Sequence, residues 1–203
     1  MSTLMEVRGI TKRYGDFTAL DDVTLSLSDA APSMTAVAGE SGSGKTTLVT
    51  RVIPALSHRG LKVSTIKHTH HNFDIDKPGK DTYRHREAGA HEVFIAGGQR
   101  WALLHENRGE REPTIEEMLD RMTEVDLVLI EGFKTYPHPK MEIYRSSVGK
   151  PMLCADDPTI VAIATTDDLE VDIPRIDLDD VEAVADFIIA FCELPAERRH
   201  GAA

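Results

Sequence analysis

Residues 39–46 read Gly39-Glu40-Ser41-Gly42-Ser43-Gly44-Lys45-Thr46 and match the phosphate-binding pattern G-x-x-x-x-G-K-[ST]. The glycines let the backbone turn tightly and bring successive N–H groups onto a phosphate. Lys45 is expected to reach the terminal phosphates, and the Thr46 hydroxyl is the expected Mg²⁺ ligand. Together with Thr47, these residues form the predicted nucleotide-binding loop, or P-loop.

The residues on either side of this loop predict a strand and a helix. Residues 34–38 are short and apolar, and residues 47–56 carry apolar side chains at helical spacing. A helix beginning here would direct its partial positive charge at the bound phosphate. Pro54 predicts a kink or a restart in that helix. A glycine-rich turn that matches by chance is the alternative, and both flanking elements argue against it.

Composition narrows the class of protein. A chain of 203 residues suits one domain with a real core, and its net charge of −11 disfavours nucleic acid and anionic membranes as partners. The sequence has neither an apolar run long enough for a membrane span nor a signal pattern, so we expect a cytoplasmic protein. Cys154 and Cys192 lack metal-ligand spacing and are expected to be small core residues.

Within the first 33 residues, the chain reads EVRGITKRYG at 6–15 and TALDDVTLSL at 18–27. These two stretches resemble the opening hairpin of ABC-transporter ATPases. In that family the aromatic residue matched by Tyr14 stacks on adenine, which would make this chain an ATP-binding transporter subunit. The remainder lacks the other ABC motifs. Residues 96–100 (AGGQR) imitate the ABC signature, but residues 101–105 predict a strand where the signature precedes a helix. We expect a short appended hairpin or a translated remnant.

Beyond the P-loop the chain resembles the molybdopterin-guanine dinucleotide biosynthesis adapter family, MobB, over about residues 34–190. The motifs occur in family order, and they are LKVSTIKHTHH at 61–71, FDIDKPGKDTYRHREAGA at 73–90, RWALLHE at 100–106, DLVLIEGFK at 126–134 and HPKME at 138–142. The departures from the family are the N-terminal extension and the Gly97-Gly98 pair.

This resemblance implies a GTP-binding adapter with slow hydrolysis, using GTP and Mg²⁺. It would assist a partner, the molybdenum cofactor guanylyltransferase, in attaching GMP to molybdopterin, and would contact molybdopterin or its guanine dinucleotide. The oligomeric state is open, with a homodimer as one option. Catalytic residues are unassigned because no base is evident. An ABC-type ATP-binding subunit and a P-loop small-molecule kinase are the alternatives, although a kinase would need an acceptor pocket with its own base.

A polar segment follows the second predicted strand, residues 61–66, which Gly60 separates from the preceding helix as a C-cap. His68 and His70 share one face of the chain here, and Lys67 lies on the other. Open α/β sheets bind ligands beyond the carboxyl ends of their strands. We therefore regard Lys67, His68 and His70 as candidate contacts to a phosphate or a metal, with a solvated polar loop as the alternative. An anionic substrate is favoured over a metal because Lys67, Lys77 and Lys80 would repel a cation.

Residues 81–88 predict a short helix with Asp81 as its N-cap. Arg84 is a further candidate substrate contact, although Arg84 and Arg86 would equally suit a charged helix face. Residues 91–96 and 101–105 then predict an antiparallel hairpin with a turn across Gly97-Gly98. Trp101 in this hairpin is either a core residue or, if exposed, an interface anchor.

A carboxylate is predicted beside the P-loop. Thr114 begins a capping box and a helix to about Met122. Residues 125–130 form the most apolar strand, which ends at Glu131. We expect Glu131 to bind Mg²⁺ directly or through water, with a structural carboxylate as the alternative. Gly132 would let the backbone approach a terminal phosphate.

The last third supplies a candidate base-reading loop. Residues 160–164 predict a buried strand that leads into residues 165–168. In guanine-binding P-loop proteins a carboxylate near this point accepts hydrogen bonds from the guanine ring. Asp168, with Asp167 as the fallback, would therefore favour GTP over ATP, although a plain polar loop fits equally well. Residues 179–191 predict an amphipathic helix that closes the core.

These elements predict an α/β protein of the P-loop NTPase class, with a doubly wound, mostly parallel sheet and a small β-hairpin insertion. The expected division is an N-terminal extension at 1–33, a MobB-like GTP-binding domain at 34–195 and a tail at 196–203.

Overall fold

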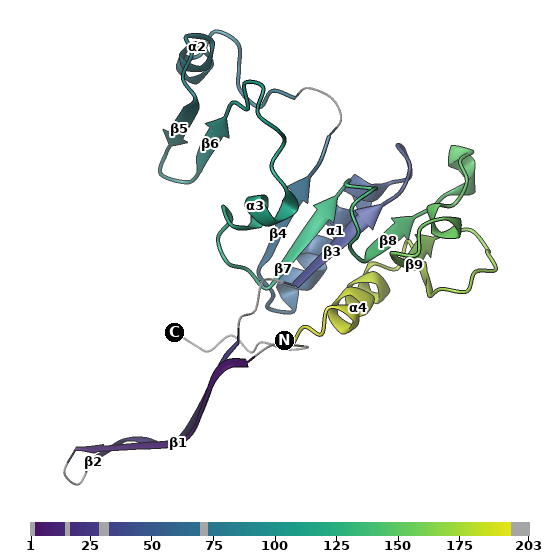
Figure 1. Cartoon of the computed structure of the whole chain (residues 1–203). Coiled ribbons are helices and arrows are strands. Elements are labelled where there is room, and N and C mark those ends of the chain that lie inside the picture. Colours follow the sequence, from purple (N-terminus) through teal and green to yellow (C-terminus); the bar gives the residue numbers. More distant parts are fainter. Residues whose placement is uncertain (1–2, 15–16, 29–32, 70–72, 196–203) are drawn as a thin grey trace. The chain divides into compact units, whose positions relative to one another are not determined.

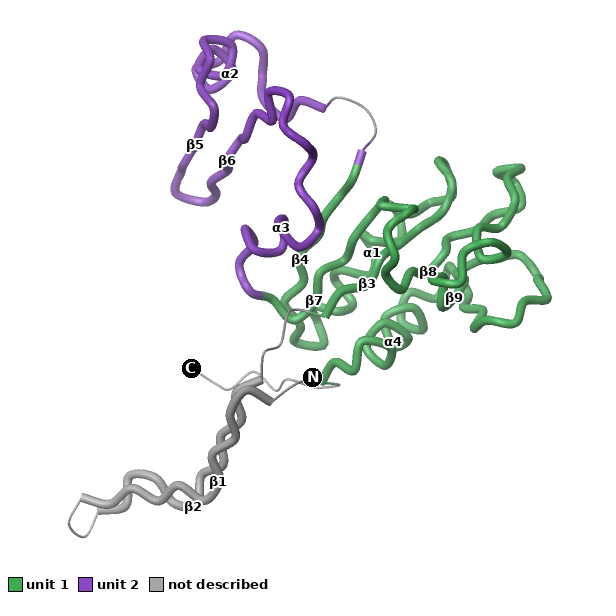
Figure 2. Tube along the Cα trace, viewed as in Figure 1, with its two compact units in different colours: residues 1–68, 125–203 green, residues 69–124 purple. Residues whose placement is uncertain are grey.

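The computed structural model describes residues 3–14, 17–28, 33–69 and 73–195, with side chains from Ser33 onward. The chain divides into two compact units, residues 1–68 with 125–203 and residues 69–124 (Figure 2). The predicted boundaries at residues 33 and 195 stay predictions. Among the helices of the described ranges, none is long and apolar enough to cross a membrane.

A six-stranded parallel sheet forms the first unit (Figure 1). Its strand order is β10-β9-β8-β3-β7-β4. The strands are β3 (Ser33–Ala38), β4 (Val63–Lys67), β7 (Leu127–Glu131), β8 (Lys140–Ile143), β9 (Ile160–Thr165) and β10 (Arg175–Asp177). The predicted α/β class with a mostly parallel sheet is confirmed.

The core lies between this sheet and two helices, α1 (Lys45–His58) and α4 (Val181–Phe191). Leu129 of β7 belongs to one apolar cluster with Val52 of α1 and Ile188 of α4. β7 is at most 1% exposed from Leu127 to Ile130, so both faces of this interior strand are covered. Burying each such side chain stabilises the fold by roughly 1.5–3 kcal/mol.

Helix α1 runs through Pro54 to His58 as one element, so the predicted restart is wrong. Buried Val52 and Leu56 on either side of Pro54 hold this stretch on the core, where packing outweighs the one helical hydrogen bond that proline cannot donate. The predicted end of this helix at Gly60 is confirmed. Gly60 has φ +82°, its N–H donates to the Ser57 carbonyl, and the helix ends in a Schellman motif.

The predicted amphipathic helix at 179–191 begins slightly later, at Val181, because the Asp180 side chain caps it by accepting from the Ala183 N–H at 3.0 Å. Cys154 and Cys192 are both half-buried. Burial raises the pKa of Cys192 to about 11, which keeps its thiol protonated and unreactive at neutral pH. Two 3₁₀ turns complete this unit, η1 (Ser146–Val148) and η2 (Leu153–Ala155).

The N-terminal segment forms an antiparallel pair, β1 (Thr3–Tyr14) with β2 (Phe17–Ser28). The predicted hairpin is therefore confirmed, although at 12 residues each its strands are longer than the short hairpin expected.

The second unit holds α2 (Asp81–Glu87), β5 (Glu92–Ala96), β6 (Trp101–His105) and α3 (Ile115–Leu119). β5 and β6 form the predicted antiparallel hairpin, as a two-stranded sheet of its own. Trp101 is not a core residue, because it is 64% exposed and stacks on Phe94 at 5.2 Å between ring centroids.

Two predicted helix boundaries in this unit need correction. Lys80 is the N-cap of α2, and Asp81 is its first helical residue, where a carboxylate still favours the positive end of the helix. Thr114 does form the predicted capping box with Glu117. Its helix ends at Leu119 instead of Met122, since the chain then turns at the C-cap, Asp120.

Arg86 of α2 has a structural role. Its guanidinium donates to Asp74 at 2.9 Å, to Asp76 at 3.2 Å and to Glu106 at 2.7 Å, and its side chain is only 14% exposed. All five N–H donors of an arginine lie in one rigid fork, so Arg86 holds the segment of Asp74 and Asp76 and the segment of Glu106 to helix α2 at once. These contacts favour the structural reading of Arg86 over direct substrate contact.

Candidate nucleotide-binding site

The P-loop leaves β3 in a conformation that requires glycine. Gly39, Gly42 and Gly44 have φ values of +139°, +85° and +102°. A Cβ atom at Gly39 would lie 2.5 Å from the Ile143 carbonyl oxygen and 2.8 Å from the Ser43 hydroxyl. The first residue of the loop is therefore glycine for steric as well as conformational reasons.

Lys45 folds back over this loop. Its ammonium donates to the carbonyls of Gly39 at 3.1 Å and Glu40 at 2.8 Å. Burial lowers the pKa of Lys45, and the carboxylate of Glu131 acts in the opposite direction. A lysine held in this way places a charged donor over the loop, where a phosphate would need one.

The two residues predicted as Mg²⁺ ligands are in direct contact. The Thr46 hydroxyl donates to Glu131 Oε1 at 2.7 Å. Lys67 joins them, with its ammonium 3.4 Å from Glu131 Oε1 and 3.5 Å from the Thr46 hydroxyl. A hydroxyl and a carboxylate supply the hard oxygen donors that Mg²⁺ prefers. The residues present therefore fit the ion that the motif implies.

Strand pairing explains how Glu131 reaches this point. β7 lies between β3 and β4 and runs parallel to both, with Glu131 opposite Val37 and Lys67. All three residues lie at the carboxyl edge of the sheet, the edge at which the P-loop leaves β3. Glu131 is held there with its side chain 13% exposed, so it is both fixed and partly shielded from water.

The turn after Glu131 is built around His68. The His68 N–H donates to the Glu131 carbonyl at 2.8 Å, and the His68 ring lies 4.4 Å from the Phe133 ring. A Cβ atom at Gly132, which has φ +104°, would lie 3.0 Å from the His68 Cβ and 3.1 Å from its carbonyl oxygen. Close packing on His68 thus requires Gly132, independently of any phosphate.

Basic residues that sequence reasoning missed also lie near the P-loop. Lys134 donates to Glu40 Oε1 at 2.8 Å, and this hydrogen bond lowers the pKa of Glu40. Arg145 and Lys150 line a small cavity together with Glu40 and Ser43. Arg145 is the second residue after β8, at the same sheet edge, so the end of that strand was the signal that could have identified it.

The candidate base-reading loop follows β9. Asp168 extends into solvent with its side chain 98% exposed and pairs with Arg175 at 2.8 Å. Asp167 instead accepts the Ser146 N–H and so connects two loops. Of the two, Asp168 is the carboxylate that a ligand can reach.

Two further candidate substrate contacts stay untested. Arg84 lies exposed on α2, in the second unit. His70 falls outside the described residues. Their roles stay predictions.

Residues 34–166 match the family model of MobB, described as "Molybdopterin guanine dinucleotide synthesis protein B". The chain belongs to the MobB family. It is 42% identical over 161 residues to the molybdopterin-guanine dinucleotide biosynthesis adapter protein of Escherichia coli, and the match covers 78% of this chain and 92% of that protein. The MobB crystal structure from Bacillus subtilis is similar with a TM-score of 0.63 at 26% identity, covering 81% of this chain and 99% of that one.

A partial likeness to transport ATPases also exists. The chain is 52% identical over 68 residues to the sulfate/thiosulfate import ATP-binding protein CysA of Burkholderia mallei. This match covers 30% of the chain and 18% of that protein, which agrees with the ABC-like N-terminal stretch. The MobB likeness spans most of both proteins, so the comparisons favour the adapter family over a transporter.

Proposed function

We propose that this protein is a GTP-binding adapter for molybdopterin-guanine dinucleotide biosynthesis. The observation that carries the proposal is the contact of Thr46 with Glu131 at 2.7 Å beside the P-loop. It lies in a chain that is 42% identical to an adapter protein of this pathway over most of its length. The proposed partner is the molybdenum cofactor guanylyltransferase, which attaches GMP to molybdopterin.

Different residues of the chain bind different parts of the proposed triphosphate. Loop N–H groups and Lys45 bind phosphate oxygens, and Thr46 and Glu131 hold Mg²⁺, directly or through water. When bound, Mg²⁺ neutralises phosphate charge. Lys67 contacts Glu131 and Lys134 contacts Glu40, so both add positive charge around the loop. Together these charges suit a polyanionic ligand.

Base selectivity is assigned to Asp168. An exposed carboxylate can accept hydrogen bonds from the guanine N1 and N2 donors, and adenine lacks that donor pair. Arg175 holds the Asp168 side chain at 2.8 Å and limits its motion, which reduces the entropy lost on binding. The proposed ligand is therefore GTP.

Hydrolysis is proposed to be slow. Glu131, the carboxylate beside Thr46 and Lys67, is proposed to hold Mg²⁺, so it is not also assigned as the base that activates water. The protein would then act by binding and presenting ligands, in the cytoplasm, with Lys67 and Arg84 as proposed contacts to molybdopterin or its guanine dinucleotide.

Reconstitution with the partner tests this function. Purified guanylyltransferase, molybdopterin, MgGTP and this protein are combined, and formation of the guanine dinucleotide is measured against the same mixture without the adapter. We expect faster formation with wild-type protein and little gain with Lys45→Ala. An equal rate with and without wild-type protein would contradict the adapter role.

A further inference from the structure

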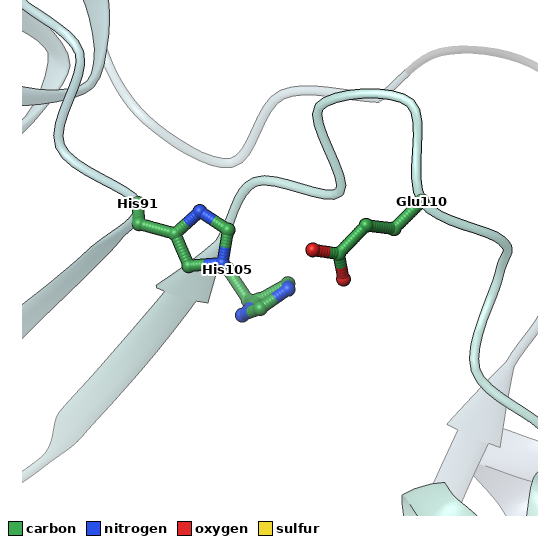
Figure 3. A group of neighbouring side chains, drawn as sticks. All are labelled: His91, His105 and Glu110. Carbon is green, nitrogen blue, oxygen red and sulfur yellow. The ribbon is translucent and has the colours of Figure 1, made fainter.

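Two histidines and a glutamate meet in the second unit, within residues 69–124. His91 directly precedes β5, His105 ends β6, and Glu110 belongs to the loop that follows. One ligating atom from each lies within 4.8 Å of the others. Figure 3 shows the Glu110 carboxylate pointing toward the two imidazole rings, which meet edge to face with centroids 5.0 Å apart.

Strand pairing fixes the two histidines at the open end of the hairpin. His105 is the register partner of Glu92, the first residue of β5, and the Glu106 N–H donates to the His91 carbonyl at 3.0 Å. Both rings are therefore carried by backbone that is hydrogen-bonded across the hairpin. A site on such elements keeps its geometry better than one on a free loop.

A tight turn brings Glu110 back to the histidines. The turn Asn107–Glu110 is closed by the Glu110 N–H donating to the Asn107 carbonyl at 2.7 Å, with φ of +44° at Arg108 and +94° at Gly109. Arginine is uncommon in this left-handed region. The Arg108 guanidinium donates to the carbonyls of Arg86 and Ala90 at 2.9 and 3.0 Å, which anchors the turn beside the histidines.

Glu92 supplies the outer contact that a metal-binding histidine needs. Its Oε1 lies 2.8 Å from His105 Nδ1. Histidine ligands almost always donate their second ring N–H to a carboxylate or carbonyl, which fixes the tautomer and the ring orientation. With Nδ1 held by Glu92, His105 Nε2 is the atom left to bind a metal.

We propose that His91, His105 and Glu110 form a Zn²⁺ site, with Glu92 as the residue that positions His105. Two imidazoles and one carboxylate are a donor set that zinc accepts, and three protein ligands leave a fourth position for water or an external donor. The carboxylates of Glu92 and Glu110 offset the charge of the ion. All three ligands are exposed, so the ion can enter and leave. Zinc bound here would tie the 107–110 turn to the open end of the hairpin.

Calorimetric titration of the full-length protein with ZnCl₂ tests this proposal. Saturating Mg²⁺ is present throughout to block hard-oxygen sites. We expect one zinc per chain at this site. His91→Ala should weaken that binding by more than about 100-fold, and Glu110→Gln and Glu92→Ala by about 10- to 100-fold, the range for lost outer contacts and weaker ligands. His85→Ala, which removes an exposed histidine of the same unit, is the matched control and should bind as wild type does.

Two spectroscopic readouts keep the outcome independent of folding. Circular dichroism must show the four variants folded, and ¹⁵N spectra of the imidazoles should show His105 coordinated through Nε2 in wild-type protein. Zinc affinity unchanged in His91→Ala, or lost equally in His85→Ala, would overturn the site. Coordination of His105 through Nδ1 would overturn the role given to Glu92. Nucleotide binding plays no part in either result.

Discussion

Glu131 is the residue at which the sheet, the P-loop and the proposed metal meet. It accepts from Thr46 at 2.7 Å and lies 3.4 Å from Lys67. Lys45, one residue before Thr46, is the proposed cationic contact to the phosphates. The chemistry proposed for the site therefore depends on a few side chains whose removal leaves the apolar core intact.

Lys45→Ala tests the phosphate contact. Because Lys45 is held over the loop by the carbonyls of Gly39 and Glu40, its loss removes a charge-assisted donor without opening a core cavity. We expect MgGTP affinity to fall at least about 10-fold, the effect of losing roughly 1.5–3 kcal/mol for a hydrogen bond to a charged group. Calorimetry measures the affinity, and an unchanged melting temperature is the control. Unchanged GTP binding in Lys45→Ala would contradict the proposal that the P-loop binds the nucleotide.

Asp168→Asn tests base recognition. The substitution replaces one acceptor with a donor, so it should weaken GTP binding and relax discrimination toward xanthosine triphosphate, which has a carbonyl where guanine has its amino group. Competition against a fluorescent GTP analogue gives both affinities. Asp167→Asn is the matched control, since Asp167 is used by the Ser146 N–H. If Asp168→Asn leaves selectivity untouched, the assignment of the base-reading residue is wrong.

The residues found from sequence and those missed differ in a physical way. Thr46 and Glu131 could be predicted from local sequence. The P-loop motif fixes the position of Thr46 relative to the sheet, and the end of an apolar strand fixes that of Glu131. Lys134, His91 and His105 depend on which side chains meet across strands or loops, which spacing alone does not encode. Gly132 was expected to let the backbone approach a phosphate. Its close packing on His68 depends on the conformation of the turn, which the sequence does not specify.

At the scale of elements, most strands could be predicted from sequence. The short strands β8 and β10, the order of strands in the sheet and the exact helix ends could not. The predicted strands before and after the P-loop, the hairpin at 91–105 and the capping box at Thr114 all occur in the structure. The errors fall at helix boundaries near Pro54, Asp81 and Met122. There, tertiary packing or a local turn outweighs the intrinsic preference of single residues.

Deletion of residues 1–32 tests whether the N-terminal hairpin serves the nucleotide. The cut stops before Ser33, because Ser33 begins β3 and its hydroxyl donates to the Cys192 carbonyl at 3.2 Å. We expect GTP and ATP affinities to change little. If Tyr14 stacked on a base, deletion would weaken ATP binding by about 1 kcal/mol or more, the size of an aromatic stacking contact. Such a loss, measured by calorimetry, would support the transporter alternative.

The Arg86 network predicts how the second unit responds to acid. A backbone hydrogen bond from Asp76 and the guanidinium of Arg86 lower the pKa of Asp74, and the Thr82 hydroxyl and Arg86 lower that of Asp76. Folded-state values below the unfolded aspartate value of about 3.9 mean that this stabilisation is complete above that pH and is lost as pH falls below it.

Arg86→Ala should therefore increase amide exchange in residues 73–106 at pH 7, and acid should add less further exchange than in wild-type protein. Hydrogen exchange followed by mass spectrometry at pH 7 and pH 3.5 measures both. Arg84→Ala, which removes an exposed guanidinium from the same helix, is the control and should behave as wild type. Equal exchange in the two variants would contradict the structural role of Arg86.

At the scale of the molecule, the chain combines a P-loop sheet with a second compact unit between β4 and β7. The parallel sheet could be predicted because apolar runs alternate with helical patterns. The compactness of residues 69–124 as a separate unit could not, since it arises from contacts such as those of Arg86 that join segments 10 to 20 residues apart.

The central claim is that the P-loop and Glu131 bind MgGTP. Calorimetric titration of the full-length protein with GTP and with ATP, each with Mg²⁺, tests it most directly. We expect one site per chain, a clear preference for GTP, and weaker binding of GTP when Mg²⁺ is removed by a chelator. Equal affinity for ATP, or GTP binding that is indifferent to Mg²⁺, would contradict it.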